Sequence, residues 1–68
     1  MEISEKIKEL RKAKGLSQLD FADKIGCGIN SVIHWEKGTY NPTLFYAICL
    51  ADFFNVSLDE LCCRDFKG

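Results

Sequence analysis

The stretch SQLDFADKIGCGINSVIHWEKG, residues 17–38, decides the fold of this 68-residue chain. Apolar residues recur at helical spacing on both sides of its glycine-flanked turn at 26–28: they are Phe21, Ala22, Ile25, Val32 and Trp35. Such spacing places the residues before the turn on one side of a helix, and those after it on one side of another. We therefore expect two short helices that pack together across the turn.

The outward side of the second of these helices is small and partly polar. The residues that lie between the inward ones are Ile29, Asn30, Ser31, Ile33 and His34. A short helix with such a side, braced by a neighbour at a steep angle, fits the major groove of DNA. The stretch therefore predicts a helix-turn-helix that contacts double-stranded DNA.

The length and composition of the chain restrict it to one globular domain. A chain of this size buries only about 60% of its unfolded surface. Its 47% apolar and 28% charged residues are typical of globular proteins. No apolar run approaches a membrane span and MEISEKIKEL has no signal-peptide apolar region, so we expect a cytoplasmic protein. Many DNA-binding domains are clearly basic, and the net charge of −1 leaves that function open.

The cysteines show no spacing typical of a metal site: they are Cys27, Cys49, Cys62 and Cys63. Cys62 and Cys63 are adjacent, which is poor geometry for an ordinary disulfide. Without a secretory context, buried or half-buried thiols are the simplest interpretation. We therefore expect no metal and no cofactor. No small-molecule ligand is implied, because the chain has no room for a separate ligand-binding domain.

Polar residues mark where several helical segments begin. Ser17, Thr43 and Ser57 each suit the cap position, because a hydroxyl accepts a hydrogen bond from a free amide of the first turn. Glu60 completes a capping box with Ser57. Gly28 is a weak cap for the segment that follows it, because glycine offers no side-chain acceptor.

Residues that favour the left-handed conformation follow the helical segments: Gly15, Gly26, Gly38 and Asn55. Apolar residues at helical spacing predict the buried sides of the first and fourth segments: Ile3, Ile7 and Leu10, then Leu44, Ala47, Ile48, Ala51 and Phe54. No useful length of chain alternates with period two. The predicted fold class is all-α, with five short helices in a single domain at 1–63 and a short flexible tail at 64–68.

Short motifs spread along residues 3–62 match one family pattern: Leu10-Arg11, Gly15-Leu16-Ser17-Gln18, Phe21-Ala22, Gly26, Val32, Trp35-Glu36-x-Gly38, Asn41-Pro42, Leu44, Leu50-Ala51 and Val56-Ser57-Leu58-Asp59-Glu60-Leu61. With these motifs the chain resembles the helix-turn-helix domain of the phage repressor and Cro family, also called Xre-type regulators. The resemblance implies a compact, lambda-repressor-like five-helix bundle whose recognition helix is about residues 29–37. It also implies a DNA-binding regulator and not an enzyme.

The resemblance implies roles for individual residues. Contacts with base edges fall to Ile29, Asn30 and His34. Contacts with phosphates fall to Gln18, Ser31, Lys37, Thr39, Tyr40 and Asn41. Arg11 and Glu36 match positions that pair with each other and tie the first helix to the end of the recognition helix. Gly28 stands where Ser or Thr is usual and Ile29 where Arg or Gln is common, which changes the usual readout.

The base-contact candidates have structural alternatives. Asn30 suits adenine N6 and N7, or is a solvated residue near a helix start. Ile29 suits a thymine methyl group, or packs against the preceding helix. His34 is the only histidine and has no catalytic partner at a recognisable spacing, so we expect it to contact DNA. Trp35 is expected to pack in the core rather than to stack on a base.

A second apolar stripe, formed by Phe45, Cys49 and Phe53, lies beside the expected buried side of the fourth segment. Exposed stripes of this kind mark interfaces, and the family pairs through its C-terminal helices. We therefore expect a dimer or partner interface that includes Phe45, Cys49, Phe53, Leu61, Cys62 and Phe66. The alternative is that the fifth helix and the tail fold back and cover the stripe.

The sequence thus predicts a sequence-specific DNA-binding transcriptional repressor that binds a pseudo-palindromic operator as a homodimer. An alternative with the same fold is a protein-interaction module, such as an antitoxin-like or anti-repressor subunit with weak or no DNA binding. The acidic balance, Ile29 and the apolar stripe favour that alternative. A redox or metal sensor that uses Cys62 and Cys63 is a third interpretation.

Overall fold

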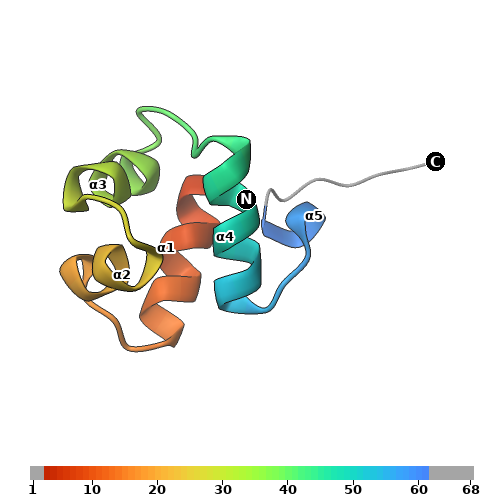
Figure 1. The fold of residues 1–68 in the computed structure, drawn as a ribbon, viewed down its shortest axis with the longest axis horizontal. Coiled ribbons are helices and arrows are strands. Elements are labelled where there is room, and N and C mark those ends of the chain that lie inside the picture. Colours follow the sequence, from red (N-terminus) through yellow and green to blue (C-terminus); the bar gives the residue numbers. More distant parts are fainter. Residues whose placement is uncertain (1–2, 62–68) are drawn as a thin grey trace.

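The computed structural model describes residues 3–61 and folds them into five α-helices (Figure 1). The helices are α1 (Ile3–Ala13), α2 (Gln18–Ile25), α3 (Ile29–Lys37), α4 (Leu44–Phe54) and α5 (Leu58–Leu61). The predicted all-α, five-helix fold class is therefore confirmed. No helix in this range is long and apolar enough to cross a membrane. Cys62, Cys63, Phe66 and the predicted tail at 64–68 lie outside the described residues.

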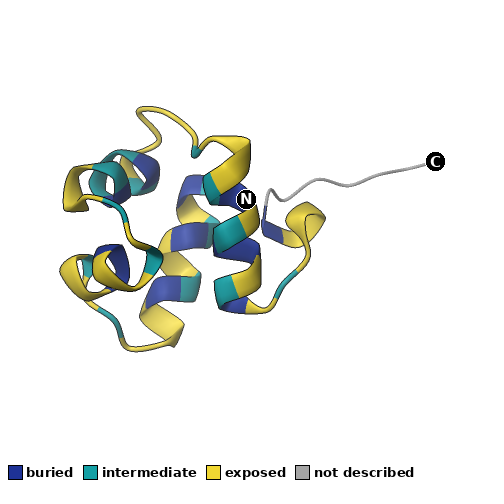
Figure 2. Cartoon of the chain, viewed as in Figure 1, coloured by how far each residue is buried: buried dark blue, intermediate teal, exposed yellow. Residues whose placement is uncertain are grey.

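All five helices contribute to one apolar core. Helix α3 packs against α1 and α2, whereas α4 packs against α2 and α5. The buried apolar side chains are Ile7, Phe21, Ala22, Val32, Trp35, Ala47, Leu50, Ala51, Phe54 and Leu61. The buried segments of the helices turn toward one another, and the helix-turn-helix pair α2 and α3 lies at the opposite end of the molecule from α5 (Figure 2).

The predicted cap residues begin three of the helices. Ser17 Oγ accepts a hydrogen bond from the amide of Asp20 at 3.1 Å, and Thr43 Oγ1 accepts one from Tyr46 at 3.4 Å. Ser57 Oγ accepts one from the amide of Glu60 at 3.0 Å. Each bond satisfies an amide that has no acceptor within its own helix. Helix α3 follows Gly28 and has no side-chain cap bond, as predicted.

Residues with positive φ follow four helices at the predicted positions: Gly15, Gly26, Gly38 and Asn55. At Gly38 φ is 79°, a conformation that glycine adopts without the steric cost of a Cβ atom. The Gly38 amide donates to the Trp35 carbonyl at 3.2 Å, and the Thr39 amide donates to the His34 carbonyl at 3.1 Å. These two bonds form a Schellman motif, which closes the C-terminal end of α3.

The buried side of α4 differs from the prediction at three positions. Leu44 is 71% exposed and Ile48 is 45% exposed, whereas Leu50, which was left out of the predicted stripe, is fully buried. Helix α4 reads LFYAICLADFF and is apolar on nearly every side, so its sequence does not mark which side faces inward. Packing against α2 and α5 determines which side of α4 faces the core, and it buries the side that carries Leu50.

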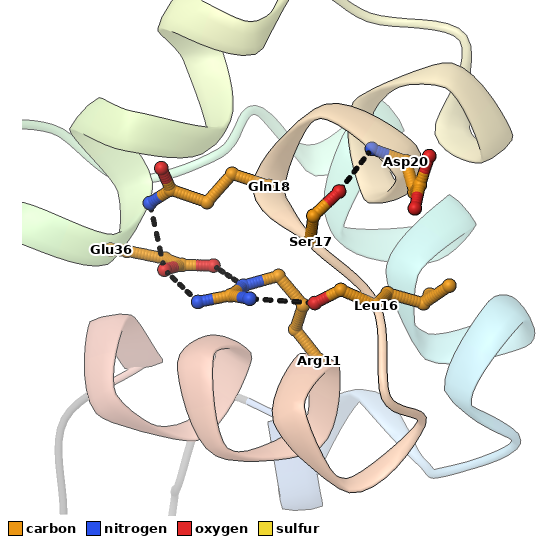
Figure 3. Close-up of polar contacts among 6 residues, drawn as sticks. All are labelled: Arg11, Leu16, Ser17, Gln18, Asp20 and Glu36. Atoms are coloured by element: carbon orange, nitrogen blue, oxygen red, sulfur yellow. Dashed lines mark hydrogen bonds and ion pairs between the residues drawn. The ribbon is translucent and has the colours of Figure 1, made fainter.

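A buried ion pair joins α1 to the end of α3 (Figure 3). Arg11 Nε donates to Glu36 Oε2 at 2.6 Å and Arg11 Nη2 donates to Glu36 Oε1 at 3.1 Å. The Arg11 side chain is only 10% exposed and that of Glu36 only 3%. This is the bidentate geometry that a guanidinium and a carboxylate prefer, and the pair is the one that the family resemblance implied.

The same pair also holds α2. Arg11 Nη1 donates to the carbonyl of Leu16 at 2.7 Å, in the segment just before α2. Gln18 Nε2, at the start of α2, donates to Glu36 Oε1 at 3.1 Å (Figure 3). Helices α1, α2 and α3 therefore meet at one carboxylate, which fixes the angle between the two helices of the helix-turn-helix.

Replacing Arg11 with Met should destabilise the domain by about 3–5 kcal/mol, because the Glu36 carboxylate would stay buried without its cation. Urea denaturation followed by circular dichroism measures this loss. The double variant Arg11→Met/Glu36→Leu removes both charges and should regain most of the stability. A double variant as unstable as Arg11→Met alone would show that the unpaired Glu36 carboxylate is not the cause of the loss.

Replacing Gly28 with Ser should raise the free energy of unfolding by about 0.5–1 kcal/mol, because serine adds the missing cap and narrows the unfolded ensemble. The site accepts a side chain, since φ at Gly28 is −79° and no neighbouring atom lies within 4 Å of an added Cβ. Thermal denaturation should show a higher Tm.

Gly26→Ser is the matched control. Its surroundings are equally open, but φ is 85°, so serine there should lower stability by roughly 1–2 kcal/mol. Equal effects of the two substitutions on Tm would argue against a missing cap at Gly28.

Candidate nucleic-acid interface

Two buried side chains anchor α3 in the domain. Val32 is fully buried and Trp35 is 2% exposed, with its ring centroid 5.4 Å from that of Tyr46. Trp35 therefore packs in the core, as expected, and its ring is not presented to a base. The opposite side of α3 is the surface that can meet a ligand.

The exposed part of α3 is narrower than the sequence predicted. Ile29 and Asn30 are exposed on the first turn, and Lys37 is exposed at the end of the helix. Ser31 and His34 are only half-buried rather than fully outward. Ile29 is 37% exposed, so part of its side chain packs on the protein and part is open to a ligand. This exposure is compatible with either interpretation of Ile29, and its contact with a base stays a prediction.

The phosphate candidates fall into two groups. Lys37, Thr39, Tyr40 and Asn41 form one exposed segment that begins at the C-terminal end of α3. Gln18 lies apart from them at the start of α2, and its side-chain amide already donates one hydrogen bond to Glu36. The first amides of a helix have no intrahelical acceptor, so the backbone of α2 at Gln18 suits a phosphate oxygen.

His34 and Tyr40 form a stacked pair that the sequence did not predict. Their ring centroids lie 5.0 Å apart and their planes are inclined by 25°. His34 Nδ1 is buried and has no hydrogen-bond partner within the part of the chain that the structure describes. Helical spacing relates residues within one helix, so it gives no signal for a contact made by the loop that follows.

Two residues of the predicted partner interface pack against other parts of the same chain. Leu61 is fully buried in the core. The ring of Phe53 is half-buried, with its centroid 5.9 Å from that of Phe21, and Lys14 Nζ lies 5.2 Å from the centroid of Phe53. The prediction is corrected for Leu61, because α5 folds back onto the core. For Phe53 it stays a prediction, because the ring that α4 turns toward α2 is partly exposed.

The exposed apolar surface of α4 lies at its N-terminal half. Leu44 is 71% exposed, Phe45 is 68% exposed and Ile48 is 45% exposed. We call these three residues the α4 apolar surface. Of these three residues, only Phe45 belongs to the predicted interface. Cys49, another residue of that predicted interface, follows Ile48 in the sequence and is half-buried.

The cysteines within residues 3–61 are free thiols. Cys27 and Cys49 are both half-buried. Burial raises the pKa of the Cys27 thiol above its ordinary value, so this thiol stays protonated and weakly nucleophilic at neutral pH. No group of three or more His, Cys, Asp or Glu residues in this range is placed to hold a metal ion.

Two curated relatives are similar to most of this chain. The cryptic phage CTXphi transcriptional repressor RstR of Vibrio cholerae is 38% identical over 64 residues, which are 94% of this chain and 57% of the repressor. The transcriptional activator BcrR of Enterococcus faecalis is 34% identical over 61 residues, which are 90% of this chain and 30% of the activator. The chain therefore spans less than two thirds of the length of either relative.

The fold and the family agree with these similarities. The crystal structure of a transcriptional regulator from Listeria innocua matches with a TM-score of 0.90 and 25% identity, covering 98% of this chain and 63% of that one. A helix-turn-helix family model matches residues 7–61. Both curated relatives named above are transcriptional regulators. The chain belongs to the Xre/Cro-type helix-turn-helix family of DNA-binding transcriptional regulators.

Proposed function

We propose that this chain is a sequence-specific DNA-binding transcriptional repressor that acts in the cytoplasm as a homodimer. The observation that carries the proposal is the geometry of α3. Val32 and Trp35 anchor one side of the helix, while Ile29 and Asn30 stand exposed on its first turn. Two copies of α3 would enter successive major grooves about 34 Å apart and read a pseudo-palindromic operator.

Base discrimination is assigned to the exposed first turn of α3. The Asn30 amide can donate to adenine N7 and accept from adenine N6, a geometry that no other base pair offers. The exposed part of Ile29 suits the methyl group of a thymine. These two residues are neighbours in the sequence, so they would read adjacent positions of one half-site.

Affinity is assigned to local contacts with phosphates, because the net charge of the chain is −1 and supplies no general attraction to DNA. Lys37 and the exposed polar residues after it, Thr39 to Asn41, suit the backbone on one side of the groove. The start of α2 at Gln18 suits the backbone on the other side.

Repression is the simplest action for a small domain that occupies an operator, since it excludes other proteins from that DNA. The repressor RstR supports this assignment, and it is similar along 94% of the chain. The alternative of a protein-interaction module is retained because the α4 apolar surface would serve a foreign partner as well as a second copy.

The homodimer is assigned to the α4 apolar surface. Leu44, Phe45 and Ile48 lie close together on one helix, and Asp52 is the only charged residue of α4. A two-fold axis across α4 would bring identical apolar side chains together without opposing like charges. Apolar patches of this kind on a small domain mark interaction sites.

Asn30→Ala should lower affinity for the operator by roughly 1–3 kcal/mol and relax the preference at one base pair, because the amide contact is specific to adenine. Fluorescence anisotropy titrations against DNA from upstream of its own gene, with single-base variants of the site, measure both effects. An equal loss on operator and random DNA would make Asn30 a positioning residue.

Lys37→Ala and Lys8→Ala are the comparison variants for this titration. Lys37→Ala should weaken binding to all DNA about equally. It should also reduce the slope of log affinity against log salt concentration by about one. Lys8 lies on the outer side of α1, so Lys8→Ala should change neither the affinity for DNA nor its salt dependence. Absence of micromolar DNA binding by the wild-type protein at low salt would instead favour the protein-interaction module.

The double variant Leu44→Glu/Phe45→Glu should shift the protein from dimer to monomer, because burying carboxylates at an apolar interface is unfavourable. Sedimentation velocity measures the oligomeric state over a range of concentrations. The fold should survive, since both side chains are largely exposed.

Leu19→Glu controls for the loss of an exposed leucine. Leu19 is 57% exposed on α2 and is not part of the α4 apolar surface, so this variant should remain dimeric. A wild-type protein that sediments as a monomer at high concentration would contradict the assignment of the α4 apolar surface to a second copy.

A further inference from the structure

His34 lies in the last turn of α3, and it is the only histidine of the chain. Its ring stacks on that of Tyr40, with centroids 5.0 Å apart and planes inclined by 25°. Tyr40 is 49% exposed and His34 is half-buried, so the stacked pair lies at the surface of the domain. The stack restricts the rotation of the imidazole.

The segment that carries Tyr40 is itself fixed by the backbone. The Thr39 amide donates to the carbonyl of His34, and Gly38 adopts a left-handed conformation with φ of 79°. The chain therefore reverses directly after α3 and returns Tyr40 to the side of the helix that carries His34. The position of the Tyr40 ring follows from this closed motif rather than from a free loop.

The environment of Nδ1 decides where the proton of the neutral ring resides. His34 Nδ1 is buried and has no hydrogen-bond partner among the described residues. Nδ1 is unpaired in either tautomer, but a proton on Nδ1 would bury the single N–H donor of the ring without an acceptor, whereas Nε2 is not among the buried unpaired atoms and can present that donor to a partner. The single proton of the neutral imidazole therefore belongs on Nε2, the ring nitrogen farther from the backbone.

We propose that His34 donates a hydrogen bond from Nε2–H to an acceptor atom of bound DNA, and that Tyr40 is the positioning residue that holds the imidazole for this bond. This proposal rests on the proposed function, in which α3 enters the major groove. Acceptors of the required kind are guanine N7 and O6, thymine O4 and the phosphate oxygens. It gives His34 a defined chemistry, that of a donor, and gives Tyr40 a role besides a phosphate contact.

The free protein tests the first half of the proposal. Nitrogen-15 NMR distinguishes the two tautomers, and a single histidine makes the assignment unambiguous. The spectrum of the neutral ring should show the proton on Nε2. Protonation of Nδ1 instead would overturn the proposal.

The Tyr40 variants test the stack in the same spectra. The imidazole carbon-bound protons should show ring-current shifts that persist in Tyr40→Phe and disappear in Tyr40→Leu. Tyr40→Phe removes only the hydroxyl proposed for a phosphate, so any loss should be equal on operator and random DNA, whereas Tyr40→Leu should lose further affinity for the operator. Equal operator affinity for Tyr40→Leu and Tyr40→Phe would remove Tyr40 as a positioning residue.

A matched pair of substitutions tests the donor. The amide nitrogen of Gln can reach the place of Nε2, whereas that of Asn reaches only the place of Nδ1. His34→Gln should keep operator affinity near that of wild type, and His34→Asn should lose about three- to tenfold, as His34→Ala does. Equal losses for Gln and Asn would show that His34 is not a donor to DNA.

The source of the acceptor is read from the same titrations. If a base supplies it, the loss in His34→Asn is confined to the operator and to one base pair. If a phosphate supplies it, the loss is equal on operator and random DNA, and the donor role stands in either case. Wild-type protein that binds no DNA overturns this proposal and the proposed function together, whereas wild-type binding that His34→Asn retains in full overturns this proposal alone.

Discussion

The rest of the structure depends on the buried ion pair between Arg11 and Glu36. Removing a guanidinium and a carboxylate from water is unfavourable unless their hydrogen-bonding groups find partners inside the protein. Here Glu36 accepts from Arg11 and Gln18, and Arg11 also donates to the carbonyl of Leu16. These bonds form together only when α1, α2 and α3 take this arrangement. The pair therefore selects one packing among those that a small apolar core would permit.

The helix ends could be predicted from the sequence because their chemistry is local. Ser17 caps an amide three residues away, and Asn55 and Gly38 terminate helices through their own backbone conformation. The inward side of α4 could not be predicted in the same way. Helix α4 is apolar nearly all round, so Leu50 and Leu44 look equivalent in the sequence. Only the positions of α2 and α5 distinguish them.

The candidate site shows the same division. Asn30 and Lys37 were predicted as exposed from helical spacing and family position, and they are exposed. The partner of Arg11 lies 25 residues away in sequence, and the family resemblance rather than any periodicity identified it. The contact between His34 and Tyr40 had no signal of either kind. It follows from the reversal of the chain at Gly38, which only the three-dimensional structure shows.

The two ends of α3 are held with unequal firmness, and this difference shapes how the helix can meet DNA. At the C-terminal end, Glu36 is bonded to two other helices and Gly38 closes a Schellman motif. At the N-terminal end, Gly28 provides no side-chain cap, and Ile29 and Asn30 follow it exposed. Ordering a loosely held turn costs conformational entropy, so only base contacts that exceed this cost keep it in place. In the proposed mode of binding, the firm end would set the register of the helix against the phosphates, while the loose end would make binding sensitive to the base pair that it meets.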